Sequence, residues 1–289
     1  MSFVSALDRR RTSVRWGLRG VQAAMLLALV VVCLGPLLWL AKSAVTPTQD
    51  TLRSPISLWP NGPDLSILSQ AWTELGLSAY LVNTVVIAAG SWAVQVVVAT
   101  TAGYALSVLR PRFGRVIYGA VLATMFVPIV LLLVPLYLTV LSLPVVHWSL
   151  VGTYAGAFLP AGASAFNVVI MKRFFDSLPR EILDAARIDG AGAYRLFWSV
   201  VLPMSRPVLG VVSVFAVLAA WKDFIWPLIV LPDPAKQPIA VRLPSIAPTT
   251  DLSVLLAAMA ISAALPILFF LLFQRLFLRS EGLEGAVKG

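Results

Sequence analysis

The sequence predicts an all-α membrane protein with six transmembrane helices. Hydrophobic residues make up 59% of the 289 residues and charged residues only 12%, whereas soluble domains are about a quarter charged. Six apolar segments reach the roughly 20 residues that a helix needs to cross a bilayer. Basic residues gather at alternate ends of these segments, as expected for helices that cross the membrane in alternating directions.

The expected spans are residues 21–41, 80–109, 116–141, 149–171, 207–231 and 252–274. The first follows a basic segment, 1–20, and no small-residue cleavage site ends it, so we expect it to be retained rather than removed as a signal peptide. The third and fourth belong to one charge-free run, which residues 142–144 and 147–149 divide. Residues 21–279 thus form one transmembrane domain, and 280–289 form a tail.

The basic residues also predict the orientation. Seventeen of the 22 lie on one set of flanks, within 1–20, 110–115, 172–206 and 275–288. The opposite flanks hold four, which are Lys42, Arg53, Lys236 and Arg242. Because cytoplasmic loops are rich in Lys and Arg, we expect both termini in the cytoplasm. Residues 42–79, 142–148 and 232–251 would then lie outside.

Composition argues against several classes of function. The single Cys33 and the single His147 provide neither a disulfide framework nor a metal cluster. The chain has no phosphate-binding P-loop and no H-E-x-x-H or G-x-S-x-G motif. We therefore predict no enzyme activity, no cofactor and no metal. The net charge of +9 lies beside apolar segments and so indicates a bilayer rather than nucleic acid.

The longest polar stretch between spans, residues 172–206, predicts a helix, a turn and a second helix. Pro179 suits a first helical turn, and Gly190 suits a C-terminal stop. Apolar side chains recur at helical spacing on both sides of Gly190. They are Leu178, Ile182, Ala185 and Ala186 before it, and Tyr194, Phe197, Trp198 and Val201 after it. The pattern is typical of a docking element with small residues at its contact surface. It is also compatible with an amphipathic hairpin lying on lipid.

One motif in this stretch carries a family resemblance. Asp184-Ala185-Ala186 is followed after three residues by Gly190, and after nine more by Val200-Val201-Leu202-Pro203. The spacing resembles the E-A-A, G and I-x-L-P loop of ABC importer permeases, the binding-protein-dependent transport inner membrane components. Asp184 stands in place of the family's Glu, and Val200 in place of its Ile.

Further segments resemble the carbohydrate-uptake branch of this family. They are YLVNTVVIA at 80–88, the AARIDGA run at 185–191, WKDFIWPL at 221–228, with Lys222 in place of Asn, and the closing GAVKG at 285–289. Related branches for polyamines and glycerol phosphate share much of this pattern, so they remain alternatives.

The resemblance implies a pore subunit in a bacterial-type plasma membrane. Its partners would be a second, related permease chain, two separate ATP-binding cassette ATPase subunits and an extracytoplasmic substrate-binding protein. The loop would act as a coupling helix that transmits ATPase closure to the pore. The residues that match its motif are Asp184, Ala185, Ala186, Arg187, Asp189, Gly190, Leu202 and Pro203.

Candidate solute contacts are fewer. Lys222 and Asp223 are the only charges inside an expected span, and they could form a polar gate or act as a snorkelling Lys and a capping Asp. Trp221 and Trp226 could stack on sugar rings or belong to an interfacial aromatic belt. Polar residues of the second span, Asn83, Gln95, Thr100 and Thr101, could line the pore, but bonds between helices are favoured.

A rival class is a secondary transporter driven by ions. It would need interrupted repeats and a relay of buried ionisable groups. Lys222 and Asp223 are the only candidates for such a relay.

Overall fold

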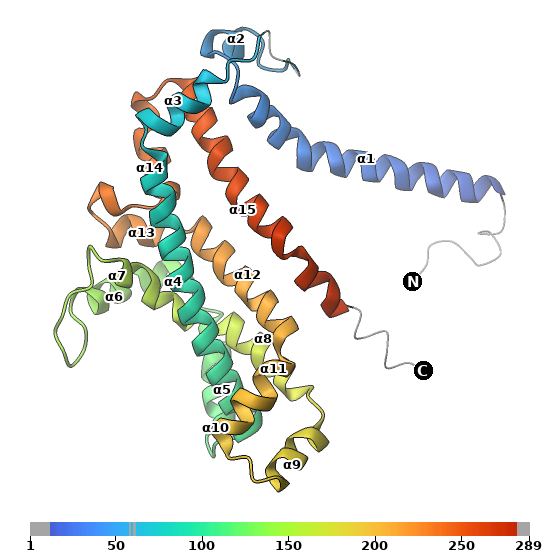
Figure 1. Ribbon diagram of the computed structural model, residues 1–289, viewed down its shortest axis with the longest axis vertical. Coiled ribbons are helices and arrows are strands. Elements are labelled where there is room, and N and C mark those ends of the chain that lie inside the picture. The colour runs from blue at the N-terminus through green and yellow to red at the C-terminus, as the bar shows by residue number, and fades with distance from the viewer. Residues whose placement is uncertain (1–11, 58, 60–61, 282–289) are drawn as a thin grey trace. The chain divides into compact units, whose positions relative to one another are not determined.

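A computed structural model describes residues 12–57, 59 and 62–281. Within these residues every regular element is a helix (Figure 1). The chain divides into two compact units. The first combines residues up to 75 with 249–261, and the second combines 76–248 with the chain from 262 onward.

The first unit holds a long apolar helix and two short ones. Helix α1 is Thr12–Ser43, α2 is Thr48–Arg53 and α3 is Ser66–Glu74. The apolar part of α1 has a mean hydropathy of 2.6, and none of it is buried within the chain. An apolar helix that is exposed in this way suits contact with lipid. The first residues of α15 (Leu252–Glu281) also belong here, and Asp251 accepts a hydrogen bond of 2.6 Å from Thr48.

The second unit is built around α4 (Leu77–Tyr104), which a π-helical turn at Ala105–Leu109 extends. Helices α8 (Ala165–Asp176) and α12 (Arg206–Lys222) pack against α4. The contact with α8 is close because α4 has a glycine there: a Cβ on Gly103 would lie 3.0 Å from the Met171 Cβ. Close packing at small residues is a common way for helices to associate in a bilayer.

Three other helical segments are broken. Helices α5 (Gly114–Thr124) and α6 (Ile129–Leu141) meet at 109°. Residues 154–163, which begin with α7 (Tyr154–Phe158), meet α8 at 46°. Residues 193–204, which include α10 (Ala193–Leu196) and α11 (Leu202–Met204), meet α12 at 80°. Among the described residues, three helices are long and apolar enough to cross a membrane, and up to six spans result if each bent pair is one span.

Two of the expected spans are interrupted. The third span, expected to be continuous over 116–141, is interrupted where Pro128 takes an extended conformation, since proline lacks the N–H that would continue a helix. The fifth span, expected over 207–231, ends at Lys222. Asp223 is extended there, and the short helix α13 (Ile225–Val230) follows.

The remaining elements are short. Helix α9 is Arg180–Ile188, and α14 is Ile239–Ile246. Single 3-10 turns occur at Leu159–Ala163, Pro234–Lys236 and Ala247–Thr249. The break expected near residues 142–149 is observed as a turn that the Leu143 N–H closes on the Trp148 carbonyl at 2.9 Å.

Candidate coupling loop and solute cavity

Helix α9 ends in a complete Schellman motif around Gly190. The Ala191 N–H donates to the Ala186 carbonyl at 2.9 Å, and the Gly190 N–H donates to the Arg187 carbonyl at 3.0 Å. Gly190 has a φ of +78°, in the left-handed region that favours glycine. The helix stop predicted from the sequence is confirmed, and the geometry explains why this position favours glycine.

One face of the loop is anchored in the core of the second unit. Leu183, Leu196, Phe197 and Val201 are buried in a single hydrophobic cluster, and Ala186 packs against that cluster. The face expected to contact a partner is therefore divided: Leu178 and Ala186 pack on the chain's own core, together with Leu183, whereas Ile182 stays exposed. Ala185 remains exposed.

The opposite face of the loop presents large apolar side chains to its surroundings. Ile182 is 41% exposed, Ile188 86%, Tyr194 78% and Trp198 52%. Asp184 and Arg187 form an ion pair of 2.7 Å on the surface, which stabilises α9 only slightly. Asp189 is exposed at the end of the helix. An anchored helix with an exposed apolar face fits a docking surface.

The second half of the loop leads into α12. Leu202 is half-buried and Pro203 is exposed in the short helix α11. The loop is tied to the end of α4, because the Tyr104 hydroxyl donates to the Ala193 carbonyl at 2.7 Å. The Tyr104 and Phe197 rings also pack with their centroids 4.9 Å apart.

A cavity of about 590 Å³ lies between α4, α6, residues 157–164 and the break after α12. Its walls are partly apolar, with Ile129, Leu133 and Phe224 among the lining residues. Five polar side chains line the rest: Ser91, Gln95, Ser164, Lys222 and Asp223. Such a mixture of apolar walls and a few polar groups is typical of small-molecule sites.

Lys222 and Asp223 lie at this cavity because α12 ends there. They form no ion pair with each other in the described part of the chain. The Asp223 carboxylate instead accepts a hydrogen bond of 3.4 Å from the Trp226 N–H, at the start of α13. Phe224 rather than Asp223 occupies the N-cap position of α13, so Asp223 bonds to the first turn of that helix from the residue before the cap and also lines the cavity wall.

Trp226 and Asn83 make structural contacts. The Trp226 ring is buried, and its Nε1 donates to the Gly156 carbonyl at 3.1 Å. The Asn83 amide donates to the carbonyls of Ala235 at 2.8 Å and Gln237 at 3.0 Å, and its oxygen accepts from the Tyr154 hydroxyl at 2.7 Å. The polar atoms of Asn83 are thus used in hydrogen bonds to other segments of the fold, which is the role that the sequence favours over lining the pore.

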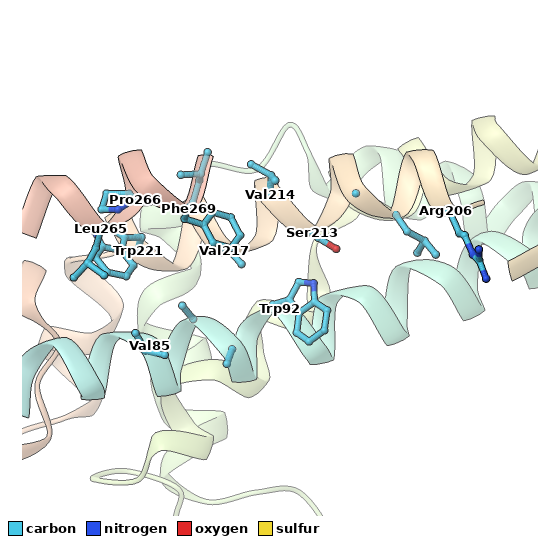
Figure 2. A pocket seen from close by; sticks show the side chains of 15 residues that line it. Val85, Trp92, Arg206, Ser213, Val214, Val217, Trp221, Leu265, Pro266 and Phe269 are labelled. Atoms are coloured by element: carbon cyan, nitrogen blue, oxygen red, sulfur yellow. The ribbon is translucent and has the colours of Figure 1, made fainter. Parts of the chain in front are cut away.

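Trp221 lies in a different cavity from Lys222. This groove of about 530 Å³ runs between α4, α12 and α15, and Val85, Trp92, Val217 and Phe269 contribute to its apolar walls. Figure 2 shows Trp221 beside Leu265 and Pro266 at one end, with Arg206 at the other. Trp221 therefore does not line the cavity that holds Lys222, Asp223 and Trp226.

Sequence reasoning missed part of the polar wall. Ser91 lies four residues before Gln95, so that both occupy one face of α4; two polar side chains at this spacing in an apolar helix were an available signal. The Asn167 side-chain amide donates to the Gln95 side-chain oxygen Oε1 at 2.7 Å and links α8 to α4. Thr100 and Thr101 bond to carbonyls of their own helix, at Val96 and Val97.

These features describe a helical membrane protein with a partly polar cavity and a loop that exposes an apolar face. The chain belongs to the family of binding-protein-dependent transport system inner membrane components, whose family model matches residues 95–281. It is a transport subunit rather than an enzyme, as the sequence predicts.

Known relatives extend the match over most of the chain. The diacetylchitobiose uptake system permease protein NgcG of Streptomyces coelicolor is 30% identical over 88% of this chain and 84% of its own length. The sn-glycerol-3-phosphate transport system permease protein UgpE of Yersinia pestis is 30% identical, over 88% and 92%.

The fold is shared with a solved bacterial ABC transporter that is involved in the import of the acidic polysaccharide alginate. Its matching chain has a TM-score of 0.78 at 21% identity, over 95% of this chain and 99% of that one. The all-α membrane fold predicted from the sequence is confirmed.

Proposed function

We propose that the chain forms half of the translocation pore of an ATP-driven importer for an uncharged sugar or oligosaccharide. The observation that carries the proposal is the two-faced loop at 180–203. Leu183, Leu196 and Phe197 fix one face to the core, while Ile182, Ile188, Tyr194 and Trp198 remain exposed on the other. A partner that binds this exposed face can therefore move the core through a rigid connection.

Two ATPase subunits, one for each permease chain, would supply that partner surface. A second, related permease chain would complete the pore, and an extracytoplasmic binding protein would deliver the solute. Both termini and the loop would lie in the cytoplasm, where most of the basic residues gather. We expect ATPase closure to act through Asp184, Ala185 and Gly190, together with Leu202 and Pro203 further along the loop.

The charge of the solute cavity favours a neutral substrate. Lys222 and Asp223 contribute one positive and one negative group, and Ser91, Gln95 and Ser164 are uncharged. Sugar hydroxyls can both donate to and accept from such groups. A phosphate ester would instead require an excess of cations at the site, because an uncompensated anion is costly to transfer from water. The balance of charges at the cavity therefore favours a neutral saccharide over a phosphate ester such as sn-glycerol 3-phosphate.

Uptake measurements test the solute class. Cells that lack this chain should lose uptake of one neutral saccharide in a panel that includes diacetylchitobiose and arabino-oligosaccharides. They should retain uptake of sn-glycerol 3-phosphate, and the binding protein should still bind its solute normally. Loss of sn-glycerol 3-phosphate uptake alone would refute the argument from cavity charge.

A pair of variants tests the cavity. Ala219 is an exposed lining residue of α12, and Ala219→Trp should fill the cavity and abolish or strongly reduce transport. Ala79→Trp makes the same change at an exposed position of α4 outside the cavity, and it should transport normally. Equal transport by both variants would exclude the cavity as part of the solute path.

Cysteine labelling tests the orientation. In a background in which Cys33 is replaced by Ser, single cysteines at exposed positions of 42–79 should react with an impermeant maleimide from outside. Cysteines at Ile188 or Tyr194 should react only after the membrane is opened. Labelling of Ile188→Cys in intact cells would overturn the proposed topology.

A further inference from the structure

A strongly basic pocket lies at the end of α4; it shares no lining residue with the solute cavity, and Arg180 is the described lining residue that it takes from the loop at 180–203. It has a volume of about 720 Å³ and lies between the segment 106–118 and the segment 172–180. Five of its lining residues are cationic: Arg110, Arg112, Arg115, Lys172 and Arg180. Asp176 is the one carboxylate among the described lining residues, which therefore carry a large positive excess.

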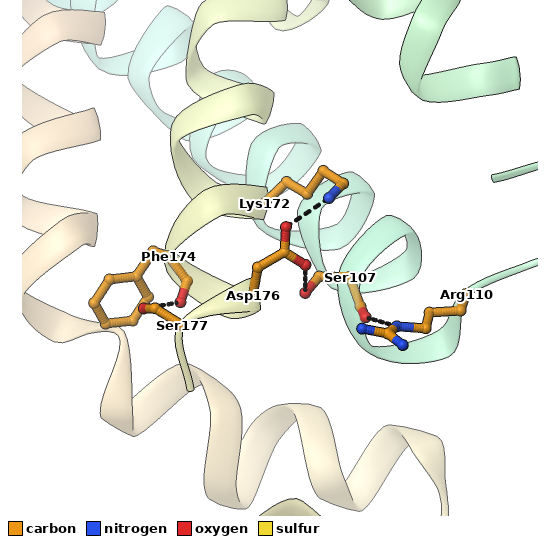
Figure 3. Close-up of polar contacts among 6 residues, drawn as sticks. All are labelled: Ser107, Arg110, Lys172, Phe174, Asp176 and Ser177. Atoms are coloured by element: carbon orange, nitrogen blue, oxygen red, sulfur yellow. Dashed lines mark hydrogen bonds and ion pairs between the residues drawn. The ribbon is translucent and has the colours of Figure 1, made fainter. Parts of the chain in front are cut away.

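The carboxylate of Asp176 is already used within the fold (Figure 3). It accepts hydrogen bonds from Lys172 Nζ at 2.6 Å and from the Ser107 hydroxyl at 2.7 Å. Lys172 also lies over the Tyr118 ring, 4.6 Å from its centroid. In the described part of the chain, Arg112, Arg115 and Arg180 form no ion pair. Their charge is therefore not neutralised by the described part of the chain.

The position of Arg110 is fixed by the backbone. Its Nε donates to the Ser107 carbonyl at 3.0 Å, as Figure 3 shows. Its φ of 51° ends the π-helical turn and directs the chain into the Arg112–Arg115 segment. A guanidinium presents several N–H donors in a planar fork and suits phosphate oxygens well.

An apolar groove adjoins the basic pocket. It has a volume of about 560 Å³ and runs along α4 and α5, with Ala102, Ile117, Ala120 and Val121 among its lining residues. Leu106 and Pro111 line both the groove and the basic pocket. One continuous surface thus joins a cationic end to an apolar channel beside two membrane-spanning segments.

We propose that this surface binds an anionic phospholipid. The headgroup phosphate would lie among Arg110, Arg112 and Arg115, and one acyl chain would occupy the apolar groove. Basic pockets between transmembrane helices bind anionic headgroups in this way. A free phosphate would use only the cationic part and would leave the groove unfilled. The proposal is independent of which solute the chain transports.

Native mass spectrometry of the full-length chain in an uncharged detergent tests the proposal. The probes are palmitoyl-oleoyl phosphatidylglycerol, the phosphatidylcholine with the same acyl chains, and inorganic phosphate. We expect the wild type to bind phosphatidylglycerol in preference to phosphatidylcholine. The double variant Arg112→Gln/Arg115→Gln should bind it about 30-fold more weakly, since each basic residue near an anionic lipid contributes about 1 kcal/mol.

Two matched controls separate the parts of the site. Arg173→Gln removes an exposed charge from α8 outside the pocket and should leave lipid binding unchanged. Ala120→Phe should fill the groove and weaken phosphatidylglycerol binding, whereas Ala123→Phe, at an exposed position of α5 outside the groove, should not.

Three results would overturn the proposal. They are equal binding of the two lipids, undiminished phosphatidylglycerol binding by the double Arg variant, and displacement of the lipid by inorganic phosphate with no effect of Ala120→Phe. The last result would identify a site for a free anion.

Discussion

Replacing Gly190 tests the coupling loop by changing the backbone alone. A Cβ added at Gly190 would have no heavy atom within 4 Å apart from the glycine's own atoms and its two chain neighbours, so the added carbon meets no other described residue of the folded chain. The effect of Gly190→Val therefore comes from its φ of +78°. Valine is β-branched and adopts this region rarely, whereas asparagine tolerates it.

The size of the effect follows from that strain. A left-handed residue with a Cβ costs about 1–2 kcal/mol, and each 1.36 kcal/mol corresponds to a tenfold change in an equilibrium. Gly190→Val should therefore lower the population of the native turn by about 5- to 30-fold. The chain would relax by changing φ at 190, which breaks the bonds from Gly190 and Ala191 to the end of α9. Gly190→Asn should retain most of the native turn.

The assay is transport and ATP hydrolysis measured on the same proteoliposomes, with the complete complex. We expect Gly190→Val to insert into the membrane normally but to lose ATPase subunits during purification, or to hydrolyse ATP without transport. Gly190→Asn should behave nearly as the wild type does. If Gly190→Val transports at the wild-type rate with normal coupling, the loop is a passive surface hairpin and the reasoning fails.

Three further predictions concern other parts of the chain. Ala185→Trp should weaken ATPase binding with little change in Tm, whereas Ala186→Trp should lower Tm because Ala186 packs on the chain's own core; a pull-down and a melting curve distinguish the two. Asn83→Ala should lower the free energy of unfolding by about 1–3 kcal/mol, because it removes three hydrogen bonds, and it should leave the KM for solute unchanged; a raised KM at constant Tm would instead indicate a solute contact. The hydrogen bond from Thr48, with further bonds from Ser253, lowers the pKa of Asp251 below 3.8. The stability that Asp251 contributes is present above pH 3.8 and is lost as the pH falls through its lower folded pKa. Hydrogen exchange of the backbone amides near α2 should show this acid sensitivity. The variant Asp251→Asn should not show it.

Much of this architecture could be predicted because it depends on local sequence signals. The apolar segments and the positive flanks indicate the spans, and Gly190 with its preceding helical pattern indicates the end of α9. These features need only the hydrophobic period and the conformational freedom of glycine.

The breaks could not be placed in the same way. Residues 116–141 hold no charged residue that would mark a break, yet the helix direction changes by 109° at the junction of α5 and α6. Pro135 lies inside α6 without ending it, while Pro128 precedes the helix in an extended conformation. A proline can occupy either position, and which one it occupies depends on packing against segments distant in sequence.

The face of α9 was ambiguous for a related reason. Ile182 and Leu183 are adjacent apolar residues, and either could point inward in a short helix with apolar residues on two sides. Leu183 points inward because it packs in the hydrophobic cluster that contains Leu196 and Phe197. Those contacts form only when the second half of the loop folds back. The spacing of the apolar residues within α9 therefore could not predict them.

The arrangement of the loop and cavity on α4 has a mechanical consequence. Tyr104 joins the end of α4 to the loop through its bond to Ala193 and its contact with Phe197, and Ser91 and Gln95 of the same helix line the solute cavity. Gln95 precedes Tyr104 by about 13 Å along the axis at 1.5 Å per residue. Leu77–Leu109 is one continuous candidate span, whereas three other candidate spans are pairs of helices that meet at angles of 46° to 109°. A displacement of the loop should therefore pass along α4 to the cavity wall, whereas a bent segment could absorb part of the same displacement at its break.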